Sequence, residues 1–160
     1  MQNFINQILI VEPRLTVAIG AYINSLLDLD FDHELQTHYR LANTEVDITS
    51  YREETIDVLR MFPPVAVFLA DKFYDEKSSH DIVPEIFRCA PNCIIYLAGD
   101  DVEAQRAAIS KLLTDAGLAN HVGQLHTHHI DDEGTFCRII NNIVRPDESR
   151  STLAAVQVRL

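Results

Sequence analysis

Short, uninterrupted apolar runs are the clearest feature of the hydrophobic pattern. They occupy residues 8–11, 65–70 and 93–97, and a weaker run lies at 122–127. Runs of this length without a polar position are typical of strands that are covered on both faces, as in a parallel sheet. The run at 65–70 ends abruptly at a carboxylate, Asp71. The pattern therefore predicts buried strands, with Asp71 at the carboxyl end of a central one.

Between these runs, apolar residues recur at helical spacing. Such stripes predict amphipathic helices at 15–27, 51–62, 104–113 and 136–143, and a shorter helix that Asp81 can cap. Each predicted helix follows a predicted strand, which is the alternation of a chain that builds a parallel sheet with helical crossovers.

Capping patterns mark several helix ends. Ser50 with Glu53, and Asp100 with Glu103, have the spacing of a capping box at a helix N-terminus. Gly117 is placed to end the helix at 104–113 in a left-handed conformation.

The segment from Asp30 to Ile48 has the least regular pattern. Apolar and polar positions alternate over 35–41, as in a half-exposed strand, and Val46 with Ile48 could form a second short piece. With one strand counted here, five strands alternate with five helices. The predicted fold class is α/β, a flavodoxin-like three-layer sandwich with a five-stranded parallel sheet and about five helices.

Length and charge limit the classes of protein to which this chain can belong. The 160 residues fit one domain, which we place at 1–145, followed by a tail or linker at 146–160 whose end is apolar. A net charge of −11 with only 13 lysines and arginines disfavours nucleic-acid binding by this domain. No apolar stretch approaches the roughly 18 to 20 residues of a membrane span, and the first residues do not resemble a secretory signal. A cytoplasmic protein with no membrane partner is expected.

Three cysteines, Cys89, Cys93 and Cys137, lack the spacing of a zinc site, and buried free thiols are expected. A separate candidate metal cluster combines two aspartates, Asp131 and Asp132, with the histidines at 126, 128 and 129. It could hold a metal, although a polar loop at the edge of the sheet is the simpler interpretation. The turn after the first strand has no glycine, so a dinucleotide site is not indicated.

The order and spacing of these elements resemble the receiver domains of two-component response regulators over residues 7–144. The resemblance is carried by ILIV before Glu12, by VAVFLA before Asp71, by CIIYLAG at 93–99 and by LHTHHIDD before the last helix. In that family, an aspartate at the end of the third strand accepts a phosphoryl group, which assigns this role to Asp71. Magnesium held by acidic residues, and a lysine, neutralise the charge that develops.

Several family positions are changed in this chain. Pro13 follows Glu12, so one carboxylate of the family's acidic pair is lost. The family's serine or threonine after the fourth strand falls on Ala98, and its lysine after the fifth strand falls on His128. A neutral imidazole is a poor replacement for a permanent positive charge. The resemblance therefore implies a degenerate, or pseudo-receiver, domain.

The resemblance also implies which cofactors the chain could bind. No cofactor is expected, or Mg²⁺ if the phosphoacceptor chemistry is retained. If magnesium did bind, its protein ligands would be Glu12, Asp71 and the backbone carbonyl of Phe73.

The leading hypothesis is a non-enzymatic, receiver-like signalling domain that regulates by binding another protein. The partner would be a sensor kinase, an effector domain or another signalling protein. A homodimer is also expected, because receivers often pair through the face that would carry Ala104, Ala107 and Ala108.

Two alternatives remain open. In the first, Asp71 is phosphorylated slowly, with Glu12 holding the metal and His128 or Lys72 replacing the lysine. In the second, the chain is a small flavodoxin-like enzyme or ligand-binding module that uses Asp71, Glu12 and His128 as acid–base groups.

Overall fold

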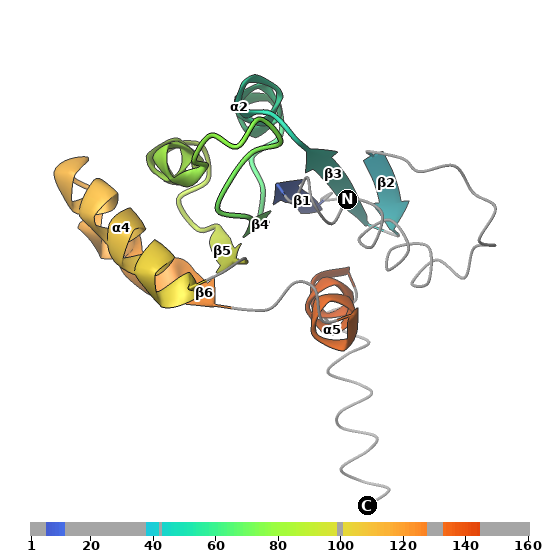
Figure 1. The fold of residues 1–160 in the computed structure, drawn as a ribbon. Helices are drawn as coiled ribbons and strands as arrows, with labels where there is room; N and C mark the ends of the chain where they lie inside the picture. The colour runs from blue at the N-terminus through green and yellow to red at the C-terminus, as the bar shows by residue number, and fades with distance from the viewer. Residues whose placement is uncertain (1–5, 12–37, 42, 99–100, 128–132, 145–160) are drawn as a thin grey trace, which may run out of the picture.

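The computed structural model describes residues 6–11, 38–41, 43–98, 101–127 and 133–144. Its centre is a six-stranded sheet with the strand order β2-β3-β1-β4-β5-β6. The strands are β1 (Asn6–Val11), β2 (His38–Leu41), β3 (Thr44–Thr49), β4 (Ala66–Leu69), β5 (Ile94–Leu97) and β6 (Leu125–Thr127). The chain is therefore a twisted α/β sheet with its helices on both faces (Figure 1).

Five of the six strands run parallel, in the order β3-β1-β4-β5-β6, and this arrangement confirms the predicted flavodoxin-like fold class. The sixth strand, β2, pairs with β3 in the antiparallel direction and forms one edge of the sheet. The parallel strands have the order found in doubly wound folds, in which the chain reverses its direction of winding after the first strand.

The strand predicted at 35–41 needs correction. A strand does occupy His38–Leu41, but it is the added antiparallel edge, and the parallel strand beside β1 is Thr44–Thr49. Only two residues separate β2 from β3, and so short a connection allows only antiparallel pairing. Val46 is fully buried opposite Ile8, as expected for an inner strand.

The helices are α2 (Arg52–Met61), α3 (Val83–Cys89), α4 (Val102–Asp115) and α5 (Glu133–Val144), with short 3₁₀ turns η2 (His80–Ile82) and η3 (Ala119–Gln124). The predicted helix at 15–27 and the predicted tail at 146–160 lie outside the described residues. None of the described helices is both long and apolar enough to cross a membrane.

The main core lies between the sheet and the layer formed by α2, α3 and α4. Leu9, Val67, Leu69 and Ile95 from the strands meet Leu59, Ile86, Phe87, Ile109 and Leu113 from the helices. The helix α5 lies on the other side of the sheet (Figure 1), where the Asn6 amide donates to the carbonyl of Ile143 at 3.4 Å. Burial on both faces explains why β4 has no polar position.

Three predicted helix starts are displaced. The carboxylate of Glu54, and not that of Glu53, accepts from the backbone N–H of Tyr51 at 2.9 Å, so the cap lies one residue later than Ser50. The second displaced start is that of α4. Asp101 caps this helix by accepting a hydrogen bond from the N–H of Ala104 at 3.1 Å. The expected cap at Asp100 lies outside the described residues.

The third displaced start is that of α3. Asp81 lies within η2 and does not cap a helix; its carboxylate instead pairs with Arg52 at 2.9 Å. Pro84 falls in the first turn of α3, where its missing N–H costs nothing. Gly117 confirms the predicted end of α4, with a left-handed φ of 75°.

Candidate functional site at the carboxyl edge of the sheet

Asp71 lies where the winding of the sheet reverses. The N–H of Ala70 donates to the carbonyl of Val11 at 2.8 Å, and the N–H of Ala98 donates to the carbonyl of Leu69 at 2.9 Å. The carboxyl ends of β1, β4 and β5 are therefore side by side, and half-buried Asp71 follows directly. Ligands of doubly wound proteins gather at this edge.

Two other predicted site residues, Glu12 and His128, lie outside the described residues. The same is true of His129, Asp131 and Asp132, so of the candidate metal cluster only His126 lies in the described part of the chain. The ring of His126 lies 5.7 Å from that of Tyr96. Among the described residues, no group of three or more histidines, cysteines or carboxylates could hold a metal.

Phe73 anchors the loop that follows Asp71. Its side chain is 1% exposed and belongs to the main core, which explains why an aromatic residue interrupts an otherwise polar loop. Its N–H donates to the carbonyl of Lys77 at 2.9 Å, and its carbonyl accepts from the N–H of Glu76 at 3.1 Å. The carbonyl that magnesium would use therefore already accepts a hydrogen bond inside a turn.

Ser79 closes the same loop. Its N–H donates to the carbonyl of Asp71 at 3.0 Å, and its buried hydroxyl donates to the carbonyl of Ala70. The side chain of Lys72 forms an ion pair with Glu76, with 3.8 Å between the amine and the carboxylate. Sequence reasoning missed Ser79 because nothing in a run of polar residues distinguishes the one that is buried.

Ala98 is buried where the resemblance implies a hydroxyl. Its carbonyl accepts from the amide of Gln105 at 3.1 Å, and the other end of that carboxamide lies 3.4 Å from the ring of His80. Gln105 is only 6% exposed. The segment after β5 is thus tied both to α4 and to η2.

The sequence does contain a signal for Gln105. It precedes Ile109 by four residues and Leu113 by eight, so it lies on the buried stripe of α4. A polar residue at such a position needs a hydrogen-bond partner, and here the partner is a backbone carbonyl at the site.

A second buried polar contact lies at the end of β3. The hydroxyls of Thr49 and Thr55 are 2.7 Å apart, and the Thr55 hydroxyl donates to the carbonyl of Tyr51 at 2.6 Å. Both threonines are buried. This contact fixes the start of α2 against the sheet.

Two of the three thiols can be placed. Cys93 is buried before β5, and burial raises its pKa from 9.0 to about 12. Cys89 is half-buried, and its pKa is raised by burial and then by the nearby carboxylate of Glu85. Both are free, as predicted, whereas the side chain of Cys137 lies outside the described residues.

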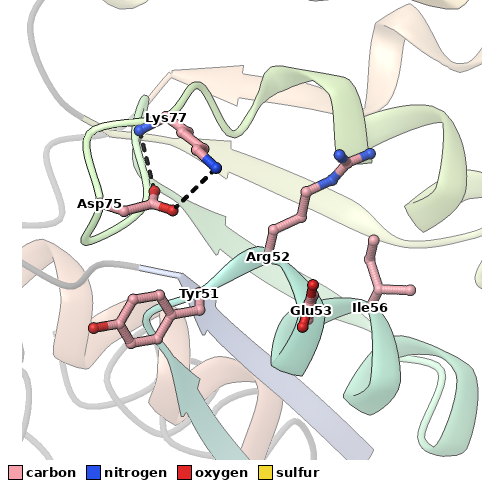
Figure 2. Close-up of a pocket in the computed structure, with 6 residues that line it drawn as sticks. All are labelled: Tyr51, Arg52, Glu53, Ile56, Asp75 and Lys77. Carbon is pink, nitrogen blue, oxygen red and sulfur yellow. Dashed lines mark hydrogen bonds and ion pairs between the residues drawn. The ribbon is translucent and has the colours of Figure 1, made fainter.

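A groove of about 550 Å³ lies between the start of α2 and the loop after β4. It is lined by Tyr51, Arg52, Glu53, Ile56, Asp75 and Lys77. Figure 2 shows the four residues from the start of α2 on one side and Asp75 with Lys77 on the other. The predicted site did not include this groove, because its residues come from two segments that only the fold brings together.

No protein-family model matches this chain, and no curated protein matches it.

Solved structures share the fold. A CheY-like response regulator receiver domain from Methanospirillum hungatei superimposes with a TM-score of 0.53 over 91% of this chain and 98% of that one, at 11% sequence identity. A response regulator from Burkholderia pseudomallei that carries a phosphorylated aspartate gives 0.51 over 93% and 74%, at 8% identity.

A third similar structure belongs to a family of streptococcal redox sensors that evolved from two-component response regulators. The TM-score is 0.54 at 11% identity, over 92% of this chain and 54% of that one, so this chain spans about half the sensor's length. Taken together, these likenesses show that the described chain has the fold of response regulator receiver domains.

Proposed function

We propose that this chain is a receiver-like signalling domain that acts by binding another protein, and that its phosphoacceptor chemistry is largely lost. One observation carries the proposal. Where a switching hydroxyl is required, the chain has buried Ala98, whose carbonyl is held by Gln105. The methyl group of Ala98 cannot donate a hydrogen bond to a phosphoryl oxygen. Phosphorylation of Asp71 would therefore have no means of moving the segment that follows β5.

The loop after Asp71 supports the same conclusion. Phosphoryl transfer to a carboxylate needs cations close to the developing charge. Lys72, the nearest lysine in the sequence, pairs with Glu76, and the carbonyl of Phe73 is engaged with the N–H of the same residue. Lys72 is thus engaged in a surface ion pair, and one of the two lone pairs of the Phe73 carbonyl is already used within the turn.

A slow phosphoacceptor is the second candidate, and one observation favours it. Asp71 is half-buried, and therefore not sealed from solvent, at the edge where doubly wound folds bind ligands. The response regulator from Burkholderia pseudomallei carries a phosphorylated aspartate on a similar fold.

Intact mass spectrometry separates the two candidates. The chain is incubated with phosphoramidate and Mg²⁺, alongside the Asp71→Asn variant. We expect no mass increase from a phosphoryl group in either protein. A phosphoryl adduct on the unaltered chain that Asp71→Asn removes would overturn the proposal in favour of the second candidate.

A further inference from the structure

We propose that the groove between the start of α2 and the loop after β4 binds a cationic segment of a partner protein, in which arginine or lysine lies next to an apolar residue. The inference rests on the proposed function, because it assigns the partner-binding surface of the same domain. It is argued from the exposed aromatic rings, the charge balance and the rigidity of this region.

Two tyrosines form an exposed aromatic surface at the groove. Tyr51 is 47% exposed and Tyr74 is 64% exposed, and their ring centroids lie 5.8 Å apart. Ile56 adds apolar surface within the groove. Exposed rings of this kind contribute large contact areas to protein interfaces, and their faces attract cations.

The charges around the groove favour a cationic occupant. Residues 51–57 and 71–81 together carry seven carboxylates against three lysines and arginines. Arg52 is paired with Asp81 at 2.9 Å, and Lys77 lies 3.9 Å from Asp75. Both positive charges of the lining are thus already compensated.

Two exposed acidic groups of α2 have no such compensation. Within the described part of the chain, neither Glu53 nor Asp57 forms an ion pair or a hydrogen bond. The N-terminus of α2 would otherwise attract an anion, but the first turn already carries the carboxylates of Glu53 and Glu54, and Glu54 accepts from the N–H groups of Ser50 and Tyr51 just before the helix. An anionic ligand would therefore meet uncompensated like charges.

The groove is also preformed. The N–H of Tyr74 donates to the carbonyl of Ser50 at 2.8 Å, which holds the loop after β4 against the end of β3. Phe73 fixes the same loop in the core. Little ordering is needed on binding, so most of the contact energy is available for affinity.

NMR titration of the full chain with a short synthetic peptide tests the inference. In the probe peptide arginine alternates with leucine, and in the matched peptide glutamate replaces each arginine. We expect saturable shifts of the amides of Tyr51, Glu53, Tyr74 and Lys77 with the arginine peptide only. Equal binding of the glutamate peptide, or shifts spread over all acidic parts of the surface, would overturn it.

Two variants localise the binding. Glu53→Lys should weaken it about threefold, as expected for a charge at the rim of an interface, and Tyr74→Ala about tenfold. The control is Glu103→Lys, since Glu103 is also exposed in the first turn of a helix but lies on α4. A loss of affinity as large in Glu103→Lys as in Glu53→Lys would refute the assignment.

The two proposals can fail separately. Phosphorylation of Asp71 would contradict the loss of phosphoacceptor chemistry, while peptide binding at the groove could still be found. If the arginine peptide does not bind, the groove is not the binding surface, whatever the state of Asp71.

Discussion

Gln105 shows how one buried side chain can hold a segment that a switch would need to move. Its amide donates to the carbonyl of Ala98, and both residues are shielded from water. A buried carbonyl that loses a donor pays a desolvation cost. The residue therefore contributes to stability as well as to the geometry of the site.

The first prediction concerns this contact. Gln105→Leu keeps the approximate side-chain volume but removes the donor to Ala98, so the free energy of unfolding should fall by about 1 to 3 kcal/mol. Urea denaturation measures the change. Lys111→Leu, an exposed substitution on the same helix, should change stability by less than about 0.5 kcal/mol. Equal effects in the two variants would contradict this role of Gln105.

The second prediction concerns Cys93, whose pKa is raised by burial to about 12. Below the ordinary pKa of 9.0, the thiol is protonated in both the folded and the unfolded chain, and pH has no effect through it. Above that value only the unfolded chain loses the proton, so stability falls with rising pH, by up to about 1.4 kcal/mol per unit.

Unfolding measured between pH 8 and pH 10, on either side of the ordinary thiol pKa of 9.0, tests this slope. Cys93→Ala should show a shallower decline than the unaltered chain, even though its cavity lowers stability at every pH. Identical slopes would show that the thiol does not titrate differently in the two states.

At the scale of elements, the apolar strands β1, β4 and β5 and the helices α2 and α4 were predictable from the sequence. Runs such as 65–70 have no polar position because both faces are buried, one of them against α2, α3 and α4. The strand at 35–41 was misjudged, because the alternation there is that of an edge strand, and the neighbouring inner strand has polar residues in its sequence. Glu45 and Asp47 interrupt the apolar pattern of β3, which hid its parallel pairing with β1.

The site was predictable only in part. The order of elements sufficed to place Asp71 and Ala98 at the carboxyl edge, since strand ends meet there in any parallel sheet. The bonds made by Ser79 depend on a loop whose shape no local pattern specifies. Gln105 could be found on the buried stripe of α4, but its partner, the carbonyl of Ala98, could not. The groove likewise needs the loop after β4 to fold back toward the start of α2.

The third prediction concerns that loop. Phe73→Ala should lower the free energy of unfolding by about 3 to 5 kcal/mol, because it opens a cavity in the core. The adjacent substitution Tyr74→Ala removes a ring that is 64% exposed and should cost less than about 0.5 kcal/mol. Thermal unfolding compares the two. A small effect of Phe73→Ala would mean that the loop is not anchored by this side chain.

At the scale of the whole molecule, one face of α4 has the composition of a surface that could pair with a second copy. Ala104, Ala107 and Ala108 are exposed along that helix. Their small side chains would permit close approach of a second helix, and the homodimer expected from the receiver resemblance stays a prediction.

The fourth prediction tests this dimer. Ala107→Arg would place a long charged side chain in the pairing surface while keeping a good helix former, so the monomer should remain folded. Light scattering after size-exclusion chromatography should give a dimer for the unaltered chain and a monomer for the variant. The same mass for both proteins would count against pairing through this face.

The central claim is that the receiver fold is retained while its phosphoryl chemistry is not. It is tested most directly by an NMR titration of the chain with Mg²⁺ and then with beryllofluoride, which imitates a phosphoryl group on aspartate. Amides at Asp71, Phe73 and Ala98 report on the site. We predict no saturable shift in either step. Saturable shifts in both steps would contradict the account and show a working phosphoacceptor.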